Sequence, residues 1–252
     1  MGGALVRGLA AFGRFRLIIC EPDPSPAIRA LARAGKIVLN PASEVMGRAR
    51  LAVIAVKPQM LAGVIAPLKP ILARMPVLSI AAGVRIATLR KLCGTRRVIR
   101  AMPNLPVEAR KGISAVFAPA PVSAAERKLA ALVLDAGGKV VFLEDEKLLD
   151  AVTAVSGSGP AYVFHLVEAL AAAAMSEGLS GTLARTLARE TVIGAAALLA
   201  SGADPAVLRA QVTSPGGTTE AGLSVLMGKG GLMPLIRQTV AAARKRAKML
   251  GQ

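Results

Sequence analysis

The pattern of apolar and polar positions changes character after about residue 145. Before that point, short runs of aliphatic and β-branched residues alternate with amphipathic stretches of helical composition. We expect strands at residues 15–20, 36–39, 51–56, 77–80, 98–101, 113–118 and 139–143. Helices are expected at 26–34 and 124–136, the second with Ser123 as its N-cap. Strand–helix alternation of this kind predicts a doubly wound α/β sheet.

The remaining residues contain no further strand run. Residues 160–199 are rich in Ala and Leu and are broken near 178–181, which predicts a long alanine-rich helix in this stretch. Ser158 and Gly159 are expected as cap residues, with Pro160 in the first helical turn. Asp204 before Pro205 predicts another helix start. We therefore divide the chain into an α/β domain at 1–145 and a helical domain at 146–252.

Composition narrows the class of protein. Lys and Arg number 32 against 15 Asp and Glu, a net charge of +17, which raises nucleic-acid binding as an alternative. Aromatic residues make up only 2%, so base stacking has little support, and we expect a solvated basic surface that attracts phosphates and carboxylates. No apolar run reaches the roughly 18 residues of a membrane span. Cys20 and Cys93 form no metal motif, and we expect both to be reduced in a cytoplasmic protein.

The segment 211–219, QVTSPGGTT, is the most informative stretch of chemistry. Two adjacent glycines allow backbone N–H groups to approach an anion, and hydroxyls at Thr213, Ser214, Thr218 and Thr219 surround the bend. Such a loop suits a small carboxylate substrate. A simple turn between two helices is the alternative.

Together with the segment 150–162, DAVTAVSGSGPAY, this loop resembles the carboxy-terminal domain of pyrroline-5-carboxylate reductase. The motifs AVKPQ at 55–59, SIAAG at 79–83 and RAMPNLP at 100–106 extend the resemblance over nearly the whole chain. That family reduces a cyclic imine to proline with NADPH or NADH. The resemblance implies a Rossmann-like domain followed by a helical dimerisation domain, with interlocked subunits and a small imine substrate bound at their interface.

The glycine-rich turn of the dinucleotide site matches the family only in part. Gly2 corresponds to the third glycine of the fingerprint, while the first strand and first two glycines have no counterpart. Met1 resembles an internal methionine of that turn, and we expect a false start whose missing central strand leaves backbone groups uncovered. Glu21, about 20 residues further on, can bind the ribose 2′-hydroxyl and gives a slight preference for NADH, although a surface acid is the alternative.

The remaining candidate cofactor-binding residues lie after predicted strands and in the segment 150–162. The corner at Ala55, Val56, Lys57 and Pro58, together with Ala81, Ala82 and Asn104, follows successive predicted strands, where ligands of open α/β sheets bind. Ser156 and Ser158 are candidates for the nicotinamide side, with helix capping as the alternative. Glu146 is a further candidate, or else an acid at the domain junction.

By resemblance, Thr219 hydrogen-bonds the imine nitrogen and is the catalytic candidate. The substrate-binding candidates are Ser214, Gly216, Gly217 and Thr218. His165, the single histidine, is expected as a packed or surface residue within a helix, and no pattern predicts a metal site.

Two other functions stay open at this point. One is a dehydrogenase of a small hydroxy acid, for which the helical half shows no catalytic lysine or histidine motif. The other is a non-catalytic helical partner or a basic nucleic-acid-binding protein, which would bind DNA in a salt-dependent way without binding cofactor.

Overall fold

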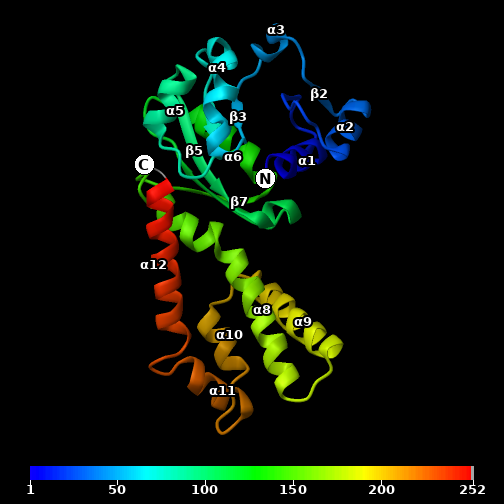
Figure 1. Ribbon diagram of the computed structural model, residues 1–252, viewed down its shortest axis with the longest axis vertical. Helices are drawn as coiled ribbons and strands as arrows, with labels where there is room; N and C mark the ends of the chain where they lie inside the picture. The colour runs from blue at the N-terminus through cyan, green and yellow to red at the C-terminus, as the bar shows by residue number, and fades with distance from the viewer. Residues whose placement is uncertain (251–252) are drawn as a thin grey trace. The chain divides into compact units, whose positions relative to one another are not determined.

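The computed structural model describes residues 1–250, which form two compact units (Figure 1). Unit 1 comprises Met1–Ser158 and the part of the last helix from Ala243 onward, and unit 2 comprises Gly159–Ala242. The strands, all in unit 1, are β1 (Leu17–Ile19), β2 (Ile37–Leu39), β3 (Ala52–Ile54), β4 (Val77–Ser79), β5 (Val98–Pro103), β6 (Gly112–Phe117) and β7 (Gly138–Phe142). Each lies within two residues of the predicted ends.

The helices of unit 1 are α1 (Gly2–Phe12), α2 (Pro26–Arg33), α3 (Ser43–Met46), η1 (Pro58–Met60), α4 (Leu61–Leu72), α5 (Ile86–Cys93), η2 (Leu105–Ala109), α6 (Ala124–Asp135), α7 (Leu148–Val152) and the π-helix η3 (Thr153–Gly157). Several begin at local caps. The Ser25 hydroxyl accepts the Ile28 N–H at 3.5 Å, and Ser123 and Glu126 form a reciprocal capping box, as expected for the second of these starts.

The strands form two sheets. β3, β4, β5, β6 and β7 lie side by side in chain order, and only β5 and β6 pair in antiparallel fashion. β1 and β2 form a separate parallel pair. Within residues 1–250, β1 and β3 therefore each have one strand neighbour and one edge without a strand partner.

Helices cover both faces of the larger sheet, and alternate residues of its strands face opposite layers. Leu78 and Ile99 pack with α1 and α6, whereas Val77 and Val98 pack with α4 and α5. All four are fully buried. By the same alternation, Ser79 and Arg100, which are register partners, face the α4–α5 side.

The boundary between the two compact units, after Ser158, falls later than the boundary between residues 145 and 146 that we drew from the sequence. α7 contacts β5 and β6, and the π-helix contacts β5, so both belong to unit 1 although they are helical. The sequence boundary marks where strands stop. It remains a prediction about domain organisation.

Unit 2 is helical throughout. Its helices are α8 (Gly159–Ser176), α9 (Gly181–Leu199), α10 (Pro205–Gln211), α11 (Thr218–Leu226) and most of α12 (Leu232–Leu250). α8 and α9 pack against each other on either side of the predicted break. Asp204 caps α10, as predicted, by accepting the Ala206 N–H at 2.7 Å. Among the described residues, no helix combines the length and apolarity required to cross a bilayer.

Candidate functional site

The predicted site residues fall into two groups, one in each unit. In unit 1 most of them follow the carboxyl ends of β1, β3, β4 and β5 or begin α1, the positions where open α/β sheets bind ligands, while Ser156 and Ser158 lie in or after the π-helix. In unit 2 they occupy the turn between α10 and α11.

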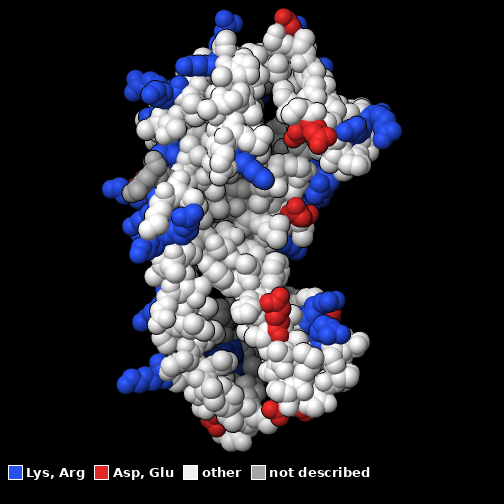
Figure 2. Space-filling model, in the orientation of Figure 1, with Lys and Arg blue, Asp and Glu red and all other residues white. Residues whose placement is uncertain are grey.

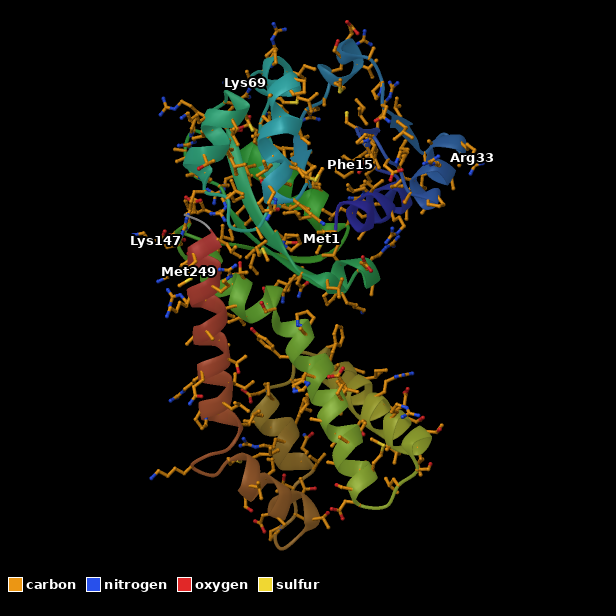
Figure 3. The ribbon with its side chains drawn as sticks, in the orientation of Figure 1. Met1, Phe15, Arg33, Lys69, Lys147 and Met249 are labelled. Carbon is orange, nitrogen blue, oxygen red and sulfur yellow. The ribbon has the colours of Figure 1, made fainter. Side chains whose placement is uncertain are left out.

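The first turn of α1 meets the corner after β3. A Cβ added at Gly2 would lie 3.0 Å from the Cβ of Ala55, so only glycine fits this approach comfortably. Met1 lies at the start of the helix, in the N-cap position (Figure 3). The positive end of an eleven-residue helix, beside a corner kept clear of side chains, fits a dinucleotide pyrophosphate. Gly2 and Ala55, far apart in the sequence, are thus brought together.

Glu21 lies in an exposed loop after β1 that is braced by Asn40. The side-chain carbonyl oxygen of Asn40 accepts the Glu21 N–H at 2.8 Å, and the side-chain NH₂ group of Asn40 donates to the Glu21 backbone carbonyl at 2.8 Å. Asn40 has a φ of 47°, which asparagine tolerates better than most residues. The Glu21 carboxylate accepts the Asp23 N–H at 3.2 Å through one oxygen. Our sequence analysis did not identify Asn40, because its partner is 19 residues away.

The corner after β3 has the extended geometry expected of a strand stopped by proline. Lys57 is the N-cap of η1, with Pro58 at its first position. Lys57 and Pro58 are exposed and Val56 is half-buried. The corner therefore places backbone and a flexible ammonium group at the rim of the sheet, a position suited to phosphate oxygens.

The turn after β4 is small and internally bonded. Ser79 is buried, and its hydroxyl accepts the Ala81 N–H at 3.3 Å. Gly83 has a φ of 77°, and a Cβ there would lie 3.0 Å from the carbonyl oxygen of Leu250. Ala81 is buried and Ala82 is exposed.

Asn104 follows β5 but is largely engaged by the fold. It is buried, and its side-chain carbonyl oxygen accepts the Ile113 N–H at 2.9 Å. This bond joins the end of β5 to the start of β6. Any contribution of Asn104 to a cofactor site would therefore come through its amide NH₂ group.

Ser156 and Ser158 lie in or directly after the π-helix. The Ser156 hydroxyl donates to the Val152 carbonyl at 3.1 Å. Ser158 has helical dihedrals, and its N–H bonds the Thr153 carbonyl at 2.9 Å, so the prediction that it caps a new helix was wrong. The π-helix follows α7 directly, and Ser158 lies between it and the first residue of α8. Nothing in the local sequence pattern signals a π-helix, a feature frequent at functional sites.

The turn of unit 2 is tighter than its composition alone indicates. Gly216 has a φ of 70°, and Gly217 is the N-cap of α11. A Cβ at Gly217 would lie 2.5 Å from the Ser214 hydroxyl oxygen. The Gly216 N–H donates to the Glu220 carboxylate at 2.7 Å, and the Gly217 N–H donates to the Ser214 carbonyl at 3.0 Å.

The N–H of Gly216, one of the two glycine donors, is thus already bonded to the carboxylate of Glu220. The donors left for a substrate carboxylate are the Ser214 hydroxyl and the backbone of the first α11 turn, at Thr218 and Thr219. Thr219 is half-buried at the second helical position. Glu220 was not identified from the sequence, although its spacing of four residues from Gly216 is a common one for side-chain-to-backbone bonds.

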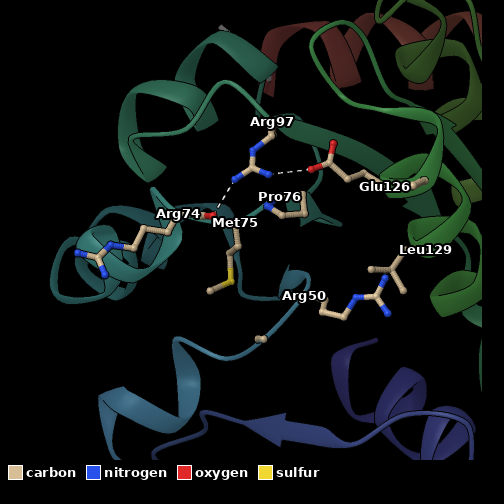
Figure 4. Close-up of a pocket in the computed structure, with 9 residues that line it drawn as sticks. Arg50, Arg74, Met75, Pro76, Arg97, Glu126 and Leu129 are labelled. Carbon is tan, nitrogen blue, oxygen red and sulfur yellow. Dashed lines mark hydrogen bonds and ion pairs between the residues drawn. The ribbon is translucent and has the colours of Figure 1, made fainter.

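Other charged features lie apart from these positions. His165 is exposed and pairs with Glu168 at 3.0 Å, so the expectation of a surface imidazole is confirmed. Lys and Arg are scattered over the visible face of unit 1 (Figure 2). A shallow pocket at the amino ends of β3, β4 and β5 is lined by Arg50, Arg74, Arg97 and Glu126, among others (Figure 4).

Arg97 in this pocket bonds Glu126 at 2.9 Å and the Arg74 carbonyl at 2.7 Å. Partial burial alone would raise the pKa of the Glu126 carboxyl. Hydrogen bonds from Ser123 and Arg97, with the Arg97 charge, outweigh it and lower that pKa below its ordinary value. The pocket lies at the opposite strand ends from the predicted cofactor positions, and we assign it a structural role.

Comparison with known proteins decides the family. Residues 146–250 match the family described as pyrroline-5-carboxylate reductase dimerisation, and residues 1–83 match NADP oxidoreductase, coenzyme F420-dependent. The chain is 41% identical over 262 aligned positions to a pyrroline-5-carboxylate reductase of Pseudomonas aeruginosa, covering 100% of this chain and 95% of the relative. The chain belongs to the pyrroline-5-carboxylate reductase family.

Relatives and solved structures agree with that membership. A pyrroline-5-carboxylate reductase of Pisum sativum is 37% identical, over 93% of this chain and 86% of its own length. The structure of a pyrroline-5-carboxylate reductase from Coxiella burnetii has a TM-score of 0.91 at 34% identity, covering 100% of this chain and 95% of that one. The Plasmodium falciparum enzyme, solved with NADP bound, has a TM-score of 0.82 at 27% identity, covering 100% and 95%. The family's Rossmann-like α/β domain and helical dimerisation domain are both present, which confirms the predicted fold class.

Proposed function

We propose that this chain reduces 1-pyrroline-5-carboxylate to L-proline, the last step of proline biosynthesis, with NADPH or NADH. The observation that carries the proposal is the turn of unit 2, which joins Ser214, the glycine pair and the hydroxyls of Thr218 and Thr219 at the positive end of α11. Family membership and the opening of α1 beside Ala55 support it.

The cofactor, when bound, supplies the hydride that adds to the imine carbon. The residues of unit 1 hold it. Gly2 and the first turn of α1 bind the pyrophosphate, and Ala55–Pro58 bind phosphate and ribose. Ala81, Ala82 and Asn104, with Ser156 and Ser158, bound the nicotinamide side. Glu21 binds the adenosine ribose, and its negative charge disfavours a 2′-phosphate, which gives the slight preference for NADH.

The substrate carboxylate is bound by the Ser214 hydroxyl and the Thr218 N–H in unit 2, as charge-assisted hydrogen bonds. Gly216 and Gly217 act by giving the turn its shape, since their N–H groups already have partners in the chain. The Thr219 hydroxyl hydrogen-bonds the ring nitrogen and orients the imine. An iminium substrate brings its own proton, so Thr219 need not act as an acid.

We further propose a homodimer or a larger homo-oligomer in which a second copy covers the apolar helix faces of unit 2, in a cytoplasmic location. The match to the family's dimerisation region at residues 146–250 supports the assembly. The exposed large side chains of α8 and α9 supply the surface, among them Phe164, Leu166, Leu183 and Ile193.

The test is imine-dependent oxidation of NADH and NADPH by the purified chain, with proline measured as product. Thr219→Ala should lower kcat/KM at least about 100-fold, the usual range for losing a group that bonds the reacting atoms. Thr186→Ala is the matched control, because the Thr186 hydroxyl bonds only within its helix, to the Thr182 carbonyl. Proline formation at the original rate by Thr219→Ala would remove Thr219 from the mechanism. No proline from the unaltered, cofactor-binding chain would refute the function.

A further inference from the structure

Two partly buried ion pairs converge on the start of α5. Glu146 accepts the backbone N–H of Ile86 at 2.8 Å and also binds the guanidinium of Arg100. Asp150, in α7, binds Arg85 at 2.9 Å. The side chains of Arg100 and Asp150 are only 6% and 5% exposed. Charges buried to this degree persist only with partners, so Arg100 and Asp150 each depend on the opposite charge beside them. The four side chains are called the cluster below, because both pairs meet the start of α5, at Arg85 and Ile86.

The cluster holds the far end of the turn at residues 79–85. The near end is fixed by the bond from the Ala81 N–H to the Ser79 hydroxyl. At the far end Arg85 occupies the N-cap position of α5, and its own side chain does not cap the helix. The Glu146 carboxylate takes over that task from 60 positions away, by accepting the first helical N–H.

The same acids lead into the π-helix. Glu146 precedes α7, Asp150 lies within it, and the π-helix with Ser156 follows at once. The π-helix also packs closely on β5, because a Cβ at Gly157 would lie 2.8 Å from the terminal methyl of Met102. One short segment therefore ties the turn after β4, the strand β5 and the π-helix together.

We propose that Glu146 and Asp150 are positioning residues that fix the turn at 79–85 and the π-helix in the arrangement that receives the nicotinamide end of the cofactor. The inference rests on the proposed function, which assigns Ala81, Ala82 and Ser156 to that end. An acid that merely lay at the domain junction would need no bond to a helix start or to a buried arginine. Glu146 makes both bonds, on the face of the sheet that carries α5.

The first test is amide hydrogen exchange on the full chain without cofactor. Glu146→Gln keeps one acceptor oxygen but leaves Arg100 without a counter-charge. Exchange at Ile86 and in the turn should rise at least about tenfold, since amides exchange through local openings of the structure. Exchange in β6 should stay unchanged. Unaltered exchange at Ile86 would overturn the proposal.

The second test measures cofactor affinity and turnover. Glu146→Gln and Asp150→Asn should each weaken NADH and NADPH binding about tenfold, because small displacements of a bound group carry large penalties. The KM for cofactor should rise more than kcat falls. Glu126→Gln is the matched control. It breaks an ion pair at the other strand ends whose acid is exposed to a similar degree, 16% against 22%, and should leave cofactor affinity within about twofold.

A double variant separates positioning from general stability. Arg100→Met with Glu146→Leu removes the charged pair together, so thermal stability should recover relative to either single change. Cofactor affinity should stay weak, because the Ile86 N–H has lost its acceptor. Recovery of both properties together would reduce the cluster to a structural role. Exchange and affinity are measured without imine. If the variants change both as expected while the unaltered chain forms no proline, the proposed function is refuted and this inference stands.

Discussion

The two units differ in how they bury their apolar residues. In unit 1, large side chains such as Leu78, Ile99 and Leu134 are fully buried between sheet and helices. In unit 2, the buried positions among the described residues are alanines, at 171, 184 and 188, while Phe164 and Leu198 are more than half exposed. Unit 1 thus has a core of its own. Unit 2 has close helix contacts through small residues and large apolar faces that a second copy would cover.

The largest expected effect tests the self-sufficiency of unit 1. Leu78→Ala should lower the free energy of unfolding by about 2–5 kcal/mol, because a fully buried leucine leaves a cavity that the sheet cannot fill. Urea unfolding followed by circular dichroism measures it. The effect should be independent of protein concentration. A concentration-dependent loss would mean that the core of unit 1 also depends on assembly.

The next effect tests the need of unit 2 for a partner. Leu166→Asp places a charge in the apolar stripe of Val163, Leu166 and Leu170, and should weaken self-association by about 2 kcal/mol or more. Sedimentation velocity over a dilution series measures this. Met60→Asp, at a residue of unit 1 exposed to a similar degree, 53% against 50%, should leave association intact. An equal shift in both variants would erase the distinction between the two surfaces.

A smaller effect concerns cofactor choice, which we place in unit 1 alone. Glu21→Ala should raise the preference for NADPH over NADH about tenfold, or about 1.4 kcal/mol, because it removes the charge that repels a 2′-phosphate. The ratio of kcat/KM values for the two cofactors measures it, and association should not change. Asn40→Ala leaves Glu21 in place but removes the two side-chain bonds that hold its loop. It should reduce the preference for NADH without reversing it. An unchanged ratio in Glu21→Ala would show that the acid does not read the ribose.

The smallest effect is the pH dependence of the Glu126 capping box. The folded-state pKa of Glu126 is lowered, so its contribution to stability is present above the unfolded pKa and is lost as the pH falls through the folded value. At pH 7, Glu126→Gln should therefore cost up to about 1 kcal/mol, because Gln can keep the capping bond but loses the charge that pairs with Arg97. The difference from the unaltered chain should vanish in acid, as followed by thermal unfolding between pH 7 and pH 3. A constant difference would mean that packing, not charge, is lost.

Local pattern predicted what local physics determines. All seven strands, the two helices α2 and α6, and the break between α8 and α9 lie close to their expected positions, because alternation, caps and glycines are encoded within a few residues. The split between the β1–β2 pair and the larger sheet was not predicted, since the sequence pattern predicted a single doubly wound sheet. The boundary between the two units after Ser158 was not predicted, since it depends on how α7 packs on β5 and β6.

The site residues likewise divide into those that local motifs identify and those that tertiary packing brings together. Gly2, Ala55 and the turn at Ser214–Thr219 were identified from motifs, and the approach of Gly2 to Ala55 agrees with a shared role. The bracing of Glu21 by Asn40 and the pairing of Glu146 with Arg100 join residues 19 and 46 positions apart. No periodicity in the chain carries that information. The π-helix likewise lies close to Met102 of β5 at Gly157, a proximity that a local pattern cannot register.

The path of the chain has a mechanical consequence. Both α1 and the last turns of α12 belong to unit 1, so unit 2 is an insertion whose two connections leave and re-enter the same body. A force applied between α1 and the end of α12 is borne first by unit 1, while unit 2 is shielded until that body yields. Stretching a single molecule should therefore rupture the nucleotide-binding half before any helix of the inserted half extends.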